Sequence, residues 1–163
     1  MPLAHRRDAI ARVRQWFESE WPAYYGPGGP GDAQRDLLDY AQQDALPFGQ
    51  LAVLDGEPVC FAALKREPFP THPQLTPWAG AAVVLPAWRR QGIGRALLDG
   101  LAVQASVMGF DRIHCATATS AYWPGVGAAP PQARVTRVVR TTRARMEAPG
   151  EGVALETPDA SAC

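Results

Sequence analysis

The chain has few cysteines, no net charge and no long apolar run, and each shortage excludes a class of protein. Its 3 cysteines form neither a metal-ligand spacing nor the even set of a disulfide framework. Its 16 basic and 16 acidic residues give a formal net charge of +0, so no overall field attracts nucleic acid or an anionic membrane. No apolar stretch approaches the roughly 20 residues of a membrane span, and the first residues lack the apolar core of a signal peptide. We expect a cytoplasmic protein without a metal.

The length favours one domain. A chain of 163 residues with 47% hydrophobic and 20% charged residues can bury a substantial core. We predict a single domain over residues 1–147, of which residues 118–147 are atypical. Residues 148–163 are small, polar and poor in large apolar groups, which predicts a disordered tail.

Helical spacing of apolar residues predicts three helices. The first covers about residues 8–20, and the second begins at a cap on Asp32 and runs to about Ala45, with Leu37, Leu38 and Ala41 on one face. The third follows Gly92 and ends at Gly109. Its apolar stripe consists of Leu97, Leu98, Leu101, Ala102, Ala105 and Met108.

The strands alternate with these helices. Residues 49–54 and 58–64 flank Asp55-Gly56, which predicts a β-hairpin. Residues 78–85 are almost continuously apolar, as in a strand buried on both faces, and residues 111–116 predict another strand. Cys60 and Cys115 fall in these strands and are expected in the core.

The most informative run is residues 83–98, where an apolar strand stops at Pro86 and a glycine pair opens a helix. Such a junction directs several backbone N–H groups and a helix N-terminus toward one point, which suits a phosphate ester. Gly92 and Gly94 lack a Cβ, so the backbone can approach a ligand closely. Three arginines, Arg89, Arg90 and Arg95, add positive charge. The junction is therefore predicted to bind an anion.

Two common phosphate-binding motifs fit this junction poorly. A mononucleotide P-loop requires Gly-Lys-Ser/Thr after its glycines, and none is present. A dinucleotide fingerprint needs its first glycine directly after the strand, whereas residues 88–91 intervene here. It also needs an acidic residue at the end of the next strand, but Asp111 lies at the start of that strand.

The junction instead resembles the GNAT superfamily of acyl-CoA N-acyltransferases. The hallmark of that family is Val-x-Pro followed by Arg/Gln-x-x-Gly-x-Gly/Ala, and here these are Val84-Leu85-Pro86 and Arg89-Arg90-Gln91-Gly92-Ile93-Gly94. The resemblance covers roughly residues 8–117, and the chain departs from the family in that an initial strand before the first helix is absent or vestigial. It implies an α/β fold (of the α+β type) with a mixed, mostly antiparallel sheet, helices on both sides and a V-shaped splay between the two central strands.

The resemblance further implies an N-acetyltransferase that transfers an acetyl group from acetyl-CoA to a primary amine of a small molecule or peptide. The pantetheine arm would lie along the unpaired backbone of Val83–Leu85 as an added strand does. The pyrophosphate would bind the amides of Gln91–Ala96, with Arg89 and Arg90 reinforcing it. The implied cofactor-binding residues are Val83, Val84, Leu85, Arg89, Arg90, Gln91, Gly92, Ile93, Gly94, Arg95 and Ala96.

The groups that move protons are harder to place. The N–H near Val84 is expected to stabilise the oxyanion, but the strand over residues 78–84 carries none of the carboxylates found there in many family members. A water relay or one of Glu20, Glu67 and His72 would then take the amine proton. Tyr122 lies near the position of the family's tyrosine general acid. The acceptor is expected to contact Trp21, Tyr24, Tyr25, His72 and Trp78, although the tryptophans could equally just cover the sheet.

The pattern of the family breaks after Thr117. Prolines and glycines over residues 122–131 prevent the expected fourth helix, and one hypothesis is that a reading-frame change replaced the end of the chain and removed the last strands. A protein that binds CoA with impaired turnover is therefore an alternative. A second alternative is a nucleic-acid-binding arm formed by the basic segment Arg134–Arg145.

Overall fold

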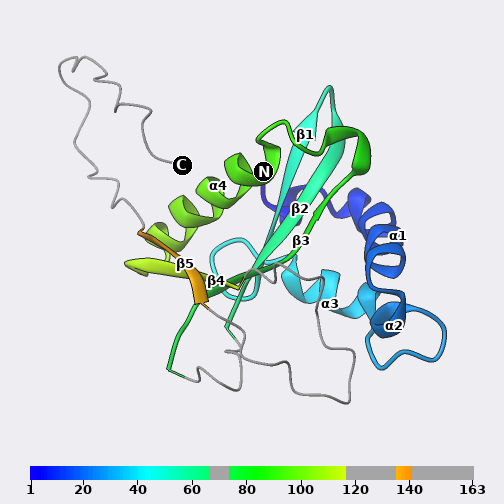
Figure 1. The fold of residues 1–163 in the computed structure, drawn as a ribbon, viewed down its shortest axis with the longest axis horizontal. Helices are drawn as coiled ribbons and strands as arrows, with labels where there is room; N and C mark the ends of the chain where they lie inside the picture. Colours follow the sequence, from blue (N-terminus) through cyan, green and yellow to red (C-terminus); the bar gives the residue numbers. More distant parts are fainter. Residues whose placement is uncertain (67–73, 117–134, 141–163) are drawn as a thin grey trace.

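The computed structural model describes residues 1–66 and 74–116 and one strand at residues 135–140, and all structural statements below concern these residues (Figure 1). In chain order the elements are η1 (Leu3–His5), η2 (Arg7–Ala9), α1 (Ile10–Glu20), α2 (Pro22–Tyr25), α3 (Ala33–Tyr40), β1 (Phe48–Leu54), β2 (Glu57–Lys65), β3 (Trp78–Val84), η3 (Pro86–Trp88), α4 (Ile93–Val107), β4 (Arg112–Ala116) and β5 (Val135–Arg140).

The strands form one mixed sheet in the order β1-β2-β3-β4-β5. Strands β1, β2 and β3 pair antiparallel, β3 and β4 pair parallel, and β4 and β5 pair antiparallel. The hairpin predicted around Asp55-Gly56 is confirmed, with Leu54 opposite Glu57. The mixed, mostly antiparallel sheet with flanking helices is also confirmed.

Side chains alternate between two cores, one on each face of the sheet. Phe61 and Ala63 face α1 and α3, where they pack with Phe17 and Leu37. The alternate residues of β2 face α4, and these are Cys60, Ala62 and Leu64. In Figure 1 the sheet runs between α4 and the pair of helices α1 and α3. Each face of β3 therefore meets a different set of helices.

The two cysteines of the described strands are core residues, as predicted. Cys60 and Cys115 are both buried, and neither forms a disulfide bond. Burial raises the pKa of the Cys60 thiol to about 11, which keeps it protonated and unreactive near neutral pH.

Helix α3 differs from the prediction in its last residue and in the exposure of one side chain. The Asp32 carboxylate caps α3 by accepting from Arg35 N at 2.9 Å, but the helix ends at Tyr40 rather than near Ala45. Leu38 was expected on the buried face, and it is 45% exposed. Adjacent helical residues point about 100° apart, and the face that carries Leu37 and Tyr40 is the one that packs on the sheet.

Helix α4 ends as predicted at Gly109, whose φ is 89°. The Gly109 amide donates to Ser106 O and the Phe110 amide donates to Ala105 O, which is the hydrogen-bond pattern of a Schellman motif. This stop turns the chain directly into β4, so the start of α4 is left at the opposite end, beside the end of β3.

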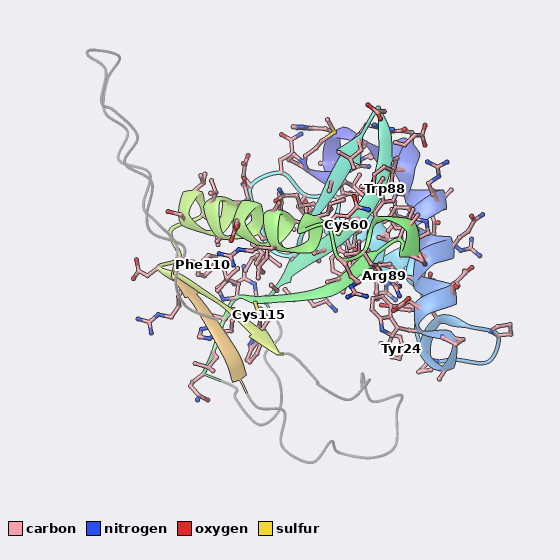
Figure 2. All side chains as sticks on the ribbon, turned by 45° about the horizontal axis from the view of Figure 1, so that its top comes forward. Tyr24, Cys60, Trp88, Arg89, Phe110 and Cys115 are labelled. Carbon is pink, nitrogen blue, oxygen red and sulfur yellow. The ribbon has the colours of Figure 1, made fainter. Side chains whose placement is uncertain are left out.

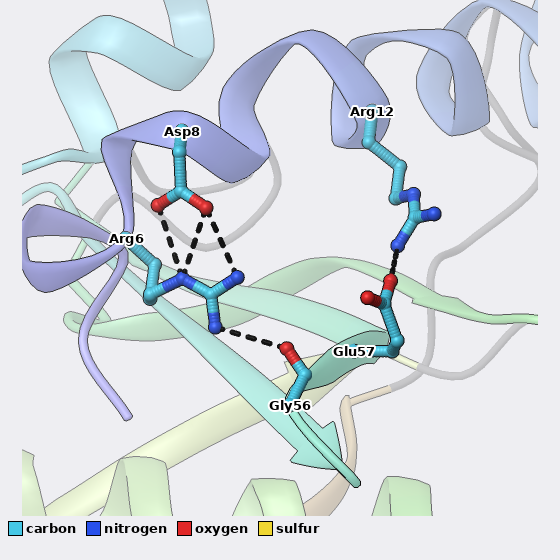
Figure 3. A network of polar contacts seen from close by, with 5 residues as sticks. All are labelled: Arg6, Asp8, Arg12, Gly56 and Glu57. Carbon is cyan, nitrogen blue, oxygen red and sulfur yellow. Dashed lines mark hydrogen bonds and ion pairs between the residues drawn. The ribbon is translucent and has the colours of Figure 1, made fainter.

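The first residues and the β1–β2 hairpin are tied together. Pro2 forms an isolated bridge with Gln50, which agrees with the predicted vestigial first strand. Arg6 pairs with Asp8 and donates to Gly56 O, and Arg12 of α1 pairs with Glu57 (Figure 3). These exposed contacts fix α1 over the hairpin.

One expectation about the end of the chain is corrected. The hypothesis of a reading-frame change implied that the last strands are lost, but a fifth strand, β5, pairs with β4 from Ala116 to Arg112. Four of the six residues 135–140 are β-branched (Val135, Thr136, Val138 and Val139), which favours a strand. The predicted tail over residues 148–163 lies outside the described residues.

Candidate functional site

The candidate site begins at a gap between the two central strands. Strands β3 and β4 pair at Trp78↔His114 and Ala79↔Cys115 and at no further described position. The edge of β3 from Gly80 to Val84 therefore faces β4 without a partner strand, over roughly 13 Å at about 3.3 Å per residue. A bulge lies within this edge, where the register to β2 shifts and Ala81 takes a φ of 50°. The predicted splay is present in the described part of the sheet.

The gap opens toward the N-terminus of α4. Arg90 and Gly92 both adopt left-handed backbone conformations, with φ of 63° and 77°. Such turns point successive N–H groups into one concavity, which is typical of anion sites. Gly92 caps α4 without a side-chain acceptor. Within the described residues, the amides of Ile93, Gly94 and Arg95 have no hydrogen-bond acceptor.

Gly94 brings this helix start against the end of β3. A Cβ on Gly94 would lie 3.4 Å from Val84 Cγ2, an ordinary contact distance. A Cβ on Gly92 would meet nothing within 4 Å, so the space above it is open. The unsatisfied amides and the unpaired strand edge thus adjoin each other.

Two of the predicted backbone donors are already used inside the protein. The Leu85 amide donates to Val59 O at 3.1 Å, and the Ala96 amide donates to Gly92 O at 3.0 Å. Peptide groups alternate in direction along an antiparallel strand, so Val83 also faces β2 and Val84 faces the gap. The predicted unpaired backbone is therefore wrong for Val83 and Leu85, whose peptide groups face β2, and holds for Val84, whose peptide groups face the gap.

Arg89 links the gap to the end of α1. Its Nε donates to Val84 O at 2.8 Å, and its Nη2 donates to Glu20 Oε2 at 3.2 Å. In Figure 2, Arg89 lies on the side of the molecule that carries α1 and Tyr24. Both side chains of this ion pair are about half exposed, at 48% and 45%. The structure thus brings Glu20, which lies 69 residues away in sequence, to the open end of the gap.

The neighbouring polar side chains differ in their partners. Among the described residues, Arg90 makes no ion pair, whereas Arg95 lies 3.8 Å from Asp99 on the exposed side of α4. The Gln91 amide group donates to Ala87 O at 3.0 Å, which braces the turn. Arg90 is thus the arginine of this turn that remains available to an anion.

The aromatic residues expected at the acceptor side form a cluster of edge-on and tilted rings at the end of α1. Trp21 and Tyr25 both pack against Phe17, at centroid distances of 5.1 and 5.4 Å, and Tyr24 packs edge-on against Tyr25. The Tyr25 hydroxyl donates to Asp36 Oδ2 at 2.7 Å. Burial, followed by this carboxylate, raises the pKa of Tyr25. Much of this cluster is therefore structural, and its partly exposed rings border the region of Glu20.

Trp78 lies at the closed end of the gap. It is buried, and its indole N–H donates to Leu75 O at 2.6 Å. It stands opposite His114 in the pairing of β3 with β4, and the ring centroids of the two residues are 5.5 Å apart. The remaining predicted residues, Glu67, His72 and Tyr122, lie outside the described residues.

Two features of this region escaped sequence reasoning. Nothing in the sequence near Arg89 indicates its contacts with Val84 O and Glu20, because the first depends on the exact turn after β3 and the second on the tertiary fold. His114 belongs to a short strand, β4, that lies between β3 and β5. Nothing in the neighbouring sequence indicates that its side chain is buried. Within the described residues no cluster of side chains could hold a metal ion, and none of the described helices is long and apolar enough to cross a membrane.

The fold and the junction agree with comparisons to known proteins. The chain matches the acetyltransferase (GNAT) family over residues 10–122, which is more than half of its length. It therefore belongs to the GNAT family of acetyltransferases, an acyltransferase class. A comparison with curated proteins found no match.

Solved structures of acetyltransferases share the fold at low identity. An aminoglycoside 6'-N-acetyltransferase complexed with coenzyme A gives a TM-score of 0.52 at 16% identity, over 66% of this chain and 54% of that chain. The aminoglycoside acetyltransferase AAC(6')-Iy with a bisubstrate analogue gives 0.53 at 21% identity, over 69% and 76%. A putative acetyltransferase from Agrobacterium tumefaciens gives 0.51 at 16% identity, over 70% and 78%. The match thus spans about half of the first of these proteins.

Proposed function

We propose that this protein transfers an acetyl group from acetyl-CoA to a primary amine of a small molecule or peptide. The observation that carries the proposal is the meeting of two backbone elements. The amides of Ile93–Arg95 have no acceptor among the described residues, and the gap-facing edge at Val84 has no partner strand, its carbonyl accepting instead from the half-exposed Arg89 side chain. An anion suits the first, because the helix dipole and the free N–H groups favour negative charge. A ligand with secondary amides suits the second, because it can pair as a strand does.

These residues fit the two halves of CoA. The amides at the start of α4 and the unpaired Arg90 would hold the pyrophosphate, and the open space above Gly92 admits it. The N–H and C=O of Val84 would pair with the pantetheine arm. The open gap then leads from the phosphates toward the bulge at Ala81, where the thioester would lie.

Arg89 has to change partners when CoA binds. A pantetheine amide that donates to Val84 O would take the place of the Arg89 Nε donor. The guanidinium released in this way is next to the phosphate site, where a charge-assisted hydrogen bond is stronger than one to a neutral carbonyl. Glu20 would lose its partner at the same moment and face the acceptor. Cofactor binding would therefore precede acceptor binding.

The chemistry then needs little beyond positioning. The amine nitrogen attacks the thioester carbonyl carbon, the C–N bond forms, and the C–S bond breaks with its electron pair leaving on the CoA sulfur. A preorganised N–H of β3 at the bulge would stabilise the negative charge on the carbonyl oxygen, because the Val84 N–H first expected in this role would pair with the pantetheine arm. Alignment of amine and thioester in the gap supplies much of the remaining acceleration.

The acceptor would approach from the face that carries α1. Helix α4 occupies the opposite face, so the face that remains is bordered by Glu20, Trp21 and Tyr24. An exposed carboxylate beside aromatic rings suits a cationic amine. Amines of this kind include those of aminoglycosides, which the names of two structural neighbours mention. The cytoplasm is the proposed compartment, supported by the unbridged thiols of Cys60 and Cys115.

Calorimetry with acetyl-CoA and desulfo-CoA tests the proposal directly. We expect binding, followed by CoA release when a panel of primary amines is added. Gly94→Val should abolish binding because its side chain would fill the space between Val84 and the helix start, whereas Gly94→Ala places its Cβ at an ordinary 3.4 Å contact and should bind more weakly but still measurably. A folded protein that shows no heat with millimolar CoA would refute the proposal.

The same assay separates the alternatives. Binding without CoA release for any amine would identify a CoA-binding protein with impaired turnover. Binding to RNA or DNA that weakens steeply with salt would instead support the basic segment Arg134–Arg145 as a nucleic-acid site.

A further inference from the structure

The ring of Tyr24 is held in place by a glycine that leaves no room for a larger residue. A Cβ on Gly31 would lie 2.3 Å from Tyr24 Cε1 and 2.8 Å from Tyr25 Cδ1, closer than Cβ atoms come to their neighbours in real proteins. The Gly31 amide also donates to Tyr24 O at 2.9 Å. The loop between α2 and α3 therefore packs directly on the Tyr24 ring.

The two tyrosines of α2 differ in what their hydroxyl groups do. The Tyr25 hydroxyl donates to Asp36 Oδ2 at 2.7 Å, and the Tyr25 ring packs on Phe17. Tyr24 meets Tyr25 edge-on at 4.7 Å, and within the described part of the chain the Tyr24 hydroxyl has no hydrogen-bond partner. Tyr24 is only half-buried. Its ring is thus fixed by Gly31 and Tyr25 and still partly open to a ligand.

Glu20 lies four residues before Tyr24, at the end of α1. It pairs with the guanidinium of Arg89, which also donates to Val84 O, so a single guanidinium connects Glu20 to the open end of the gap. Figure 2 shows Arg89 and Tyr24 on the same side of the molecule. Once Arg89 has moved to the phosphates, the Glu20 carboxylate remains beside this end of the aromatic cluster without its counterion.

The reacting centre is expected further along β3. Val84 is three residues from the bulge at Ala81, which is roughly 10 Å along the strand at about 3.3 Å per residue. Glu20 is connected to the first of these positions, whereas the thioester is expected at the second. The two positions suit two different groups of one acceptor.

An anionic and aromatic site does not suit the nitrogen that attacks. Attack requires a free lone pair, but a primary amine with an ordinary pKa of about 10.4 is almost entirely protonated near neutral pH. A nearby carboxylate favours the protonated form further, and an aromatic ring attracts the same cation. Both groups would therefore hold a reacting nitrogen in the form that cannot attack. A second amino group of the same molecule can stay protonated throughout and would be stabilised by both.

We infer that Glu20 and Tyr24 form a subsite for a second, protonated amino group, and that the acceptor is a diamine or polyamine. This inference rests on the proposed function. The neutral nitrogen forms the C–N bond and releases its proton to solvent, the C–S bond breaks with its electron pair leaving on the CoA sulfur, and the second nitrogen keeps its proton at the subsite. Gly31 is a positioning residue, because it acts through the Tyr24 ring.

The test compares α,ω-diamines with n-alkylamines that have the same number of non-hydrogen atoms, over a series of chain lengths at saturating acetyl-CoA. The members of a pair differ only in whether the far end is an ammonium or a methyl group. At the best-fitting length, kcat/KM, halved for the two equivalent amines of the diamine, should favour the diamine roughly 3- to 30-fold. This is the combined effect of an exposed ion pair and an exposed cation–π contact. The preference should shrink at high salt.

Substitutions in the subsite should lower this preference. Glu20→Gln removes the charge and should lower it about 1.4- to 5-fold. Tyr24→Leu removes the ring and should lower it about 2- to 5-fold, whereas Tyr24→Phe keeps the ring and the preference. Each variant is compared with the wild type on the same two amines, which cancels their intrinsic difference in reactivity. Glu18→Gln is the matched control, since it removes the carboxylate of another arginine pair of α1, with Arg14, and should leave the preference unchanged.

Gly31→Ala tests whether the glycine acts through Tyr24. Its Cβ should displace the Tyr24 ring and lower the diamine preference toward that of Tyr24→Leu. In the Tyr24→Leu background the same substitution should lower the preference no further, because the ring on which it acts is gone. A merely structural role of Gly31 would change the urea midpoint and leave the preference as it is.

The outcomes separate the subsite from the proposed function. If a protein that transfers acetyl groups uses both members of every pair equally well, the subsite is wrong and the proposed function stands. The same holds if the diamine is preferred but neither Glu20→Gln nor Tyr24→Leu alters the preference. An equal effect of Gly31→Ala with and without the Tyr24 ring overturns the role of Gly31. Protein that transfers to no amine at all overturns the proposed function and the subsite with it.

Discussion

The partner exchange of Arg89 makes a prediction in which two neighbouring substitutions have opposite effects on CoA binding. Glu20→Gln removes the charge that holds the Arg89 guanidinium in the free protein, but it leaves the phosphate site intact. Arg89→Ala removes the guanidinium from both states. If Arg89 moves from Val84 O and Glu20 to the phosphates, the first change should tighten the binding of CoA and the second should weaken it.

The contacts of Arg89 determine how much each substitution should change the Kd of CoA. The Arg89–Glu20 pair is about half exposed on both sides, so its loss changes the free state by roughly 0.2–1 kcal/mol. This lowers the Kd of CoA for Glu20→Gln by about 1.4- to 5-fold. Arg89→Ala loses a charge-assisted bond of about 2.2 kcal/mol but no longer has to break contacts of about 1.6 kcal/mol, which leaves a weakening of about threefold.

Isothermal titration with desulfo-CoA at two salt concentrations measures both effects. The Arg89→Ala penalty should shrink at high salt, because an exposed phosphate contact is screened. Glu57→Gln is the matched control, since it removes the carboxylate of another exposed arginine pair, with Arg12, that involves neither Arg89 nor Val84 (Figure 3). Weaker CoA binding in Glu20→Gln, or an unchanged Kd in Arg89→Ala, would show that Arg89 does not exchange partners.

Two further predictions concern stability. Gly49→Ala places a Cβ 2.9 Å from Phe61 Cε2 and 3.0 Å from Tyr40 Cβ inside the core, so we expect a loss of about 1–3 kcal/mol in urea unfolding; an unchanged midpoint would mean that the core under α3 is loosely packed. Tyr25 has a pKa raised above its ordinary 10.0 by burial and by Asp36, so the folded state binds the phenolic proton more tightly than the unfolded state. Its stabilising contribution is complete below pH 10 and is lost as the pH rises further. Tyr25→Phe should therefore be less stable than wild type at pH 8 by about 1 kcal/mol and should lose less stability between pH 8 and pH 11; equal losses in both proteins would contradict this.

The parts of the fold that depend on short-range pattern were predictable. The Asp55-Gly56 turn, the Asp32 cap and the Gly109 stop each depend on a residue whose chemistry acts within a few positions, and all three are present. The glycine pair beside Val-x-Pro predicted the junction for the same reason. By contrast, the C-terminal end of α3 and the exposure of Leu38 depend on which face of α3 packs on the sheet, and no short-range pattern determines that.

The parts that depend on distant segments were not predictable. Leu85 was expected to be available to a ligand, but the register of β2 against β3 places its amide on Val59 O, and that register has no signature in residues 83–85. The pairing of β5 with β4 was not expected, because the prolines and glycines of residues 122–131 lie between the two strands in sequence and indicated that the family pattern ends there. Glu20 was one of several candidates, and only the tertiary structure brings it to Arg89.

The brief pairing of β3 with β4 has a consequence for the whole protein. A sheet divided after two register positions is held across the division by those two paired positions and by α4, which packs on both β3 and β4. A ligand in the gap that hydrogen-bonds to the free edge of β3 would add contacts between the two halves of the sheet. Ligand occupancy would then stabilise the native state in proportion to its concentration, by about 2.7 kcal/mol at a hundredfold excess over Kd. The lifetime of the protein in a cell would follow the supply of its acyl donor.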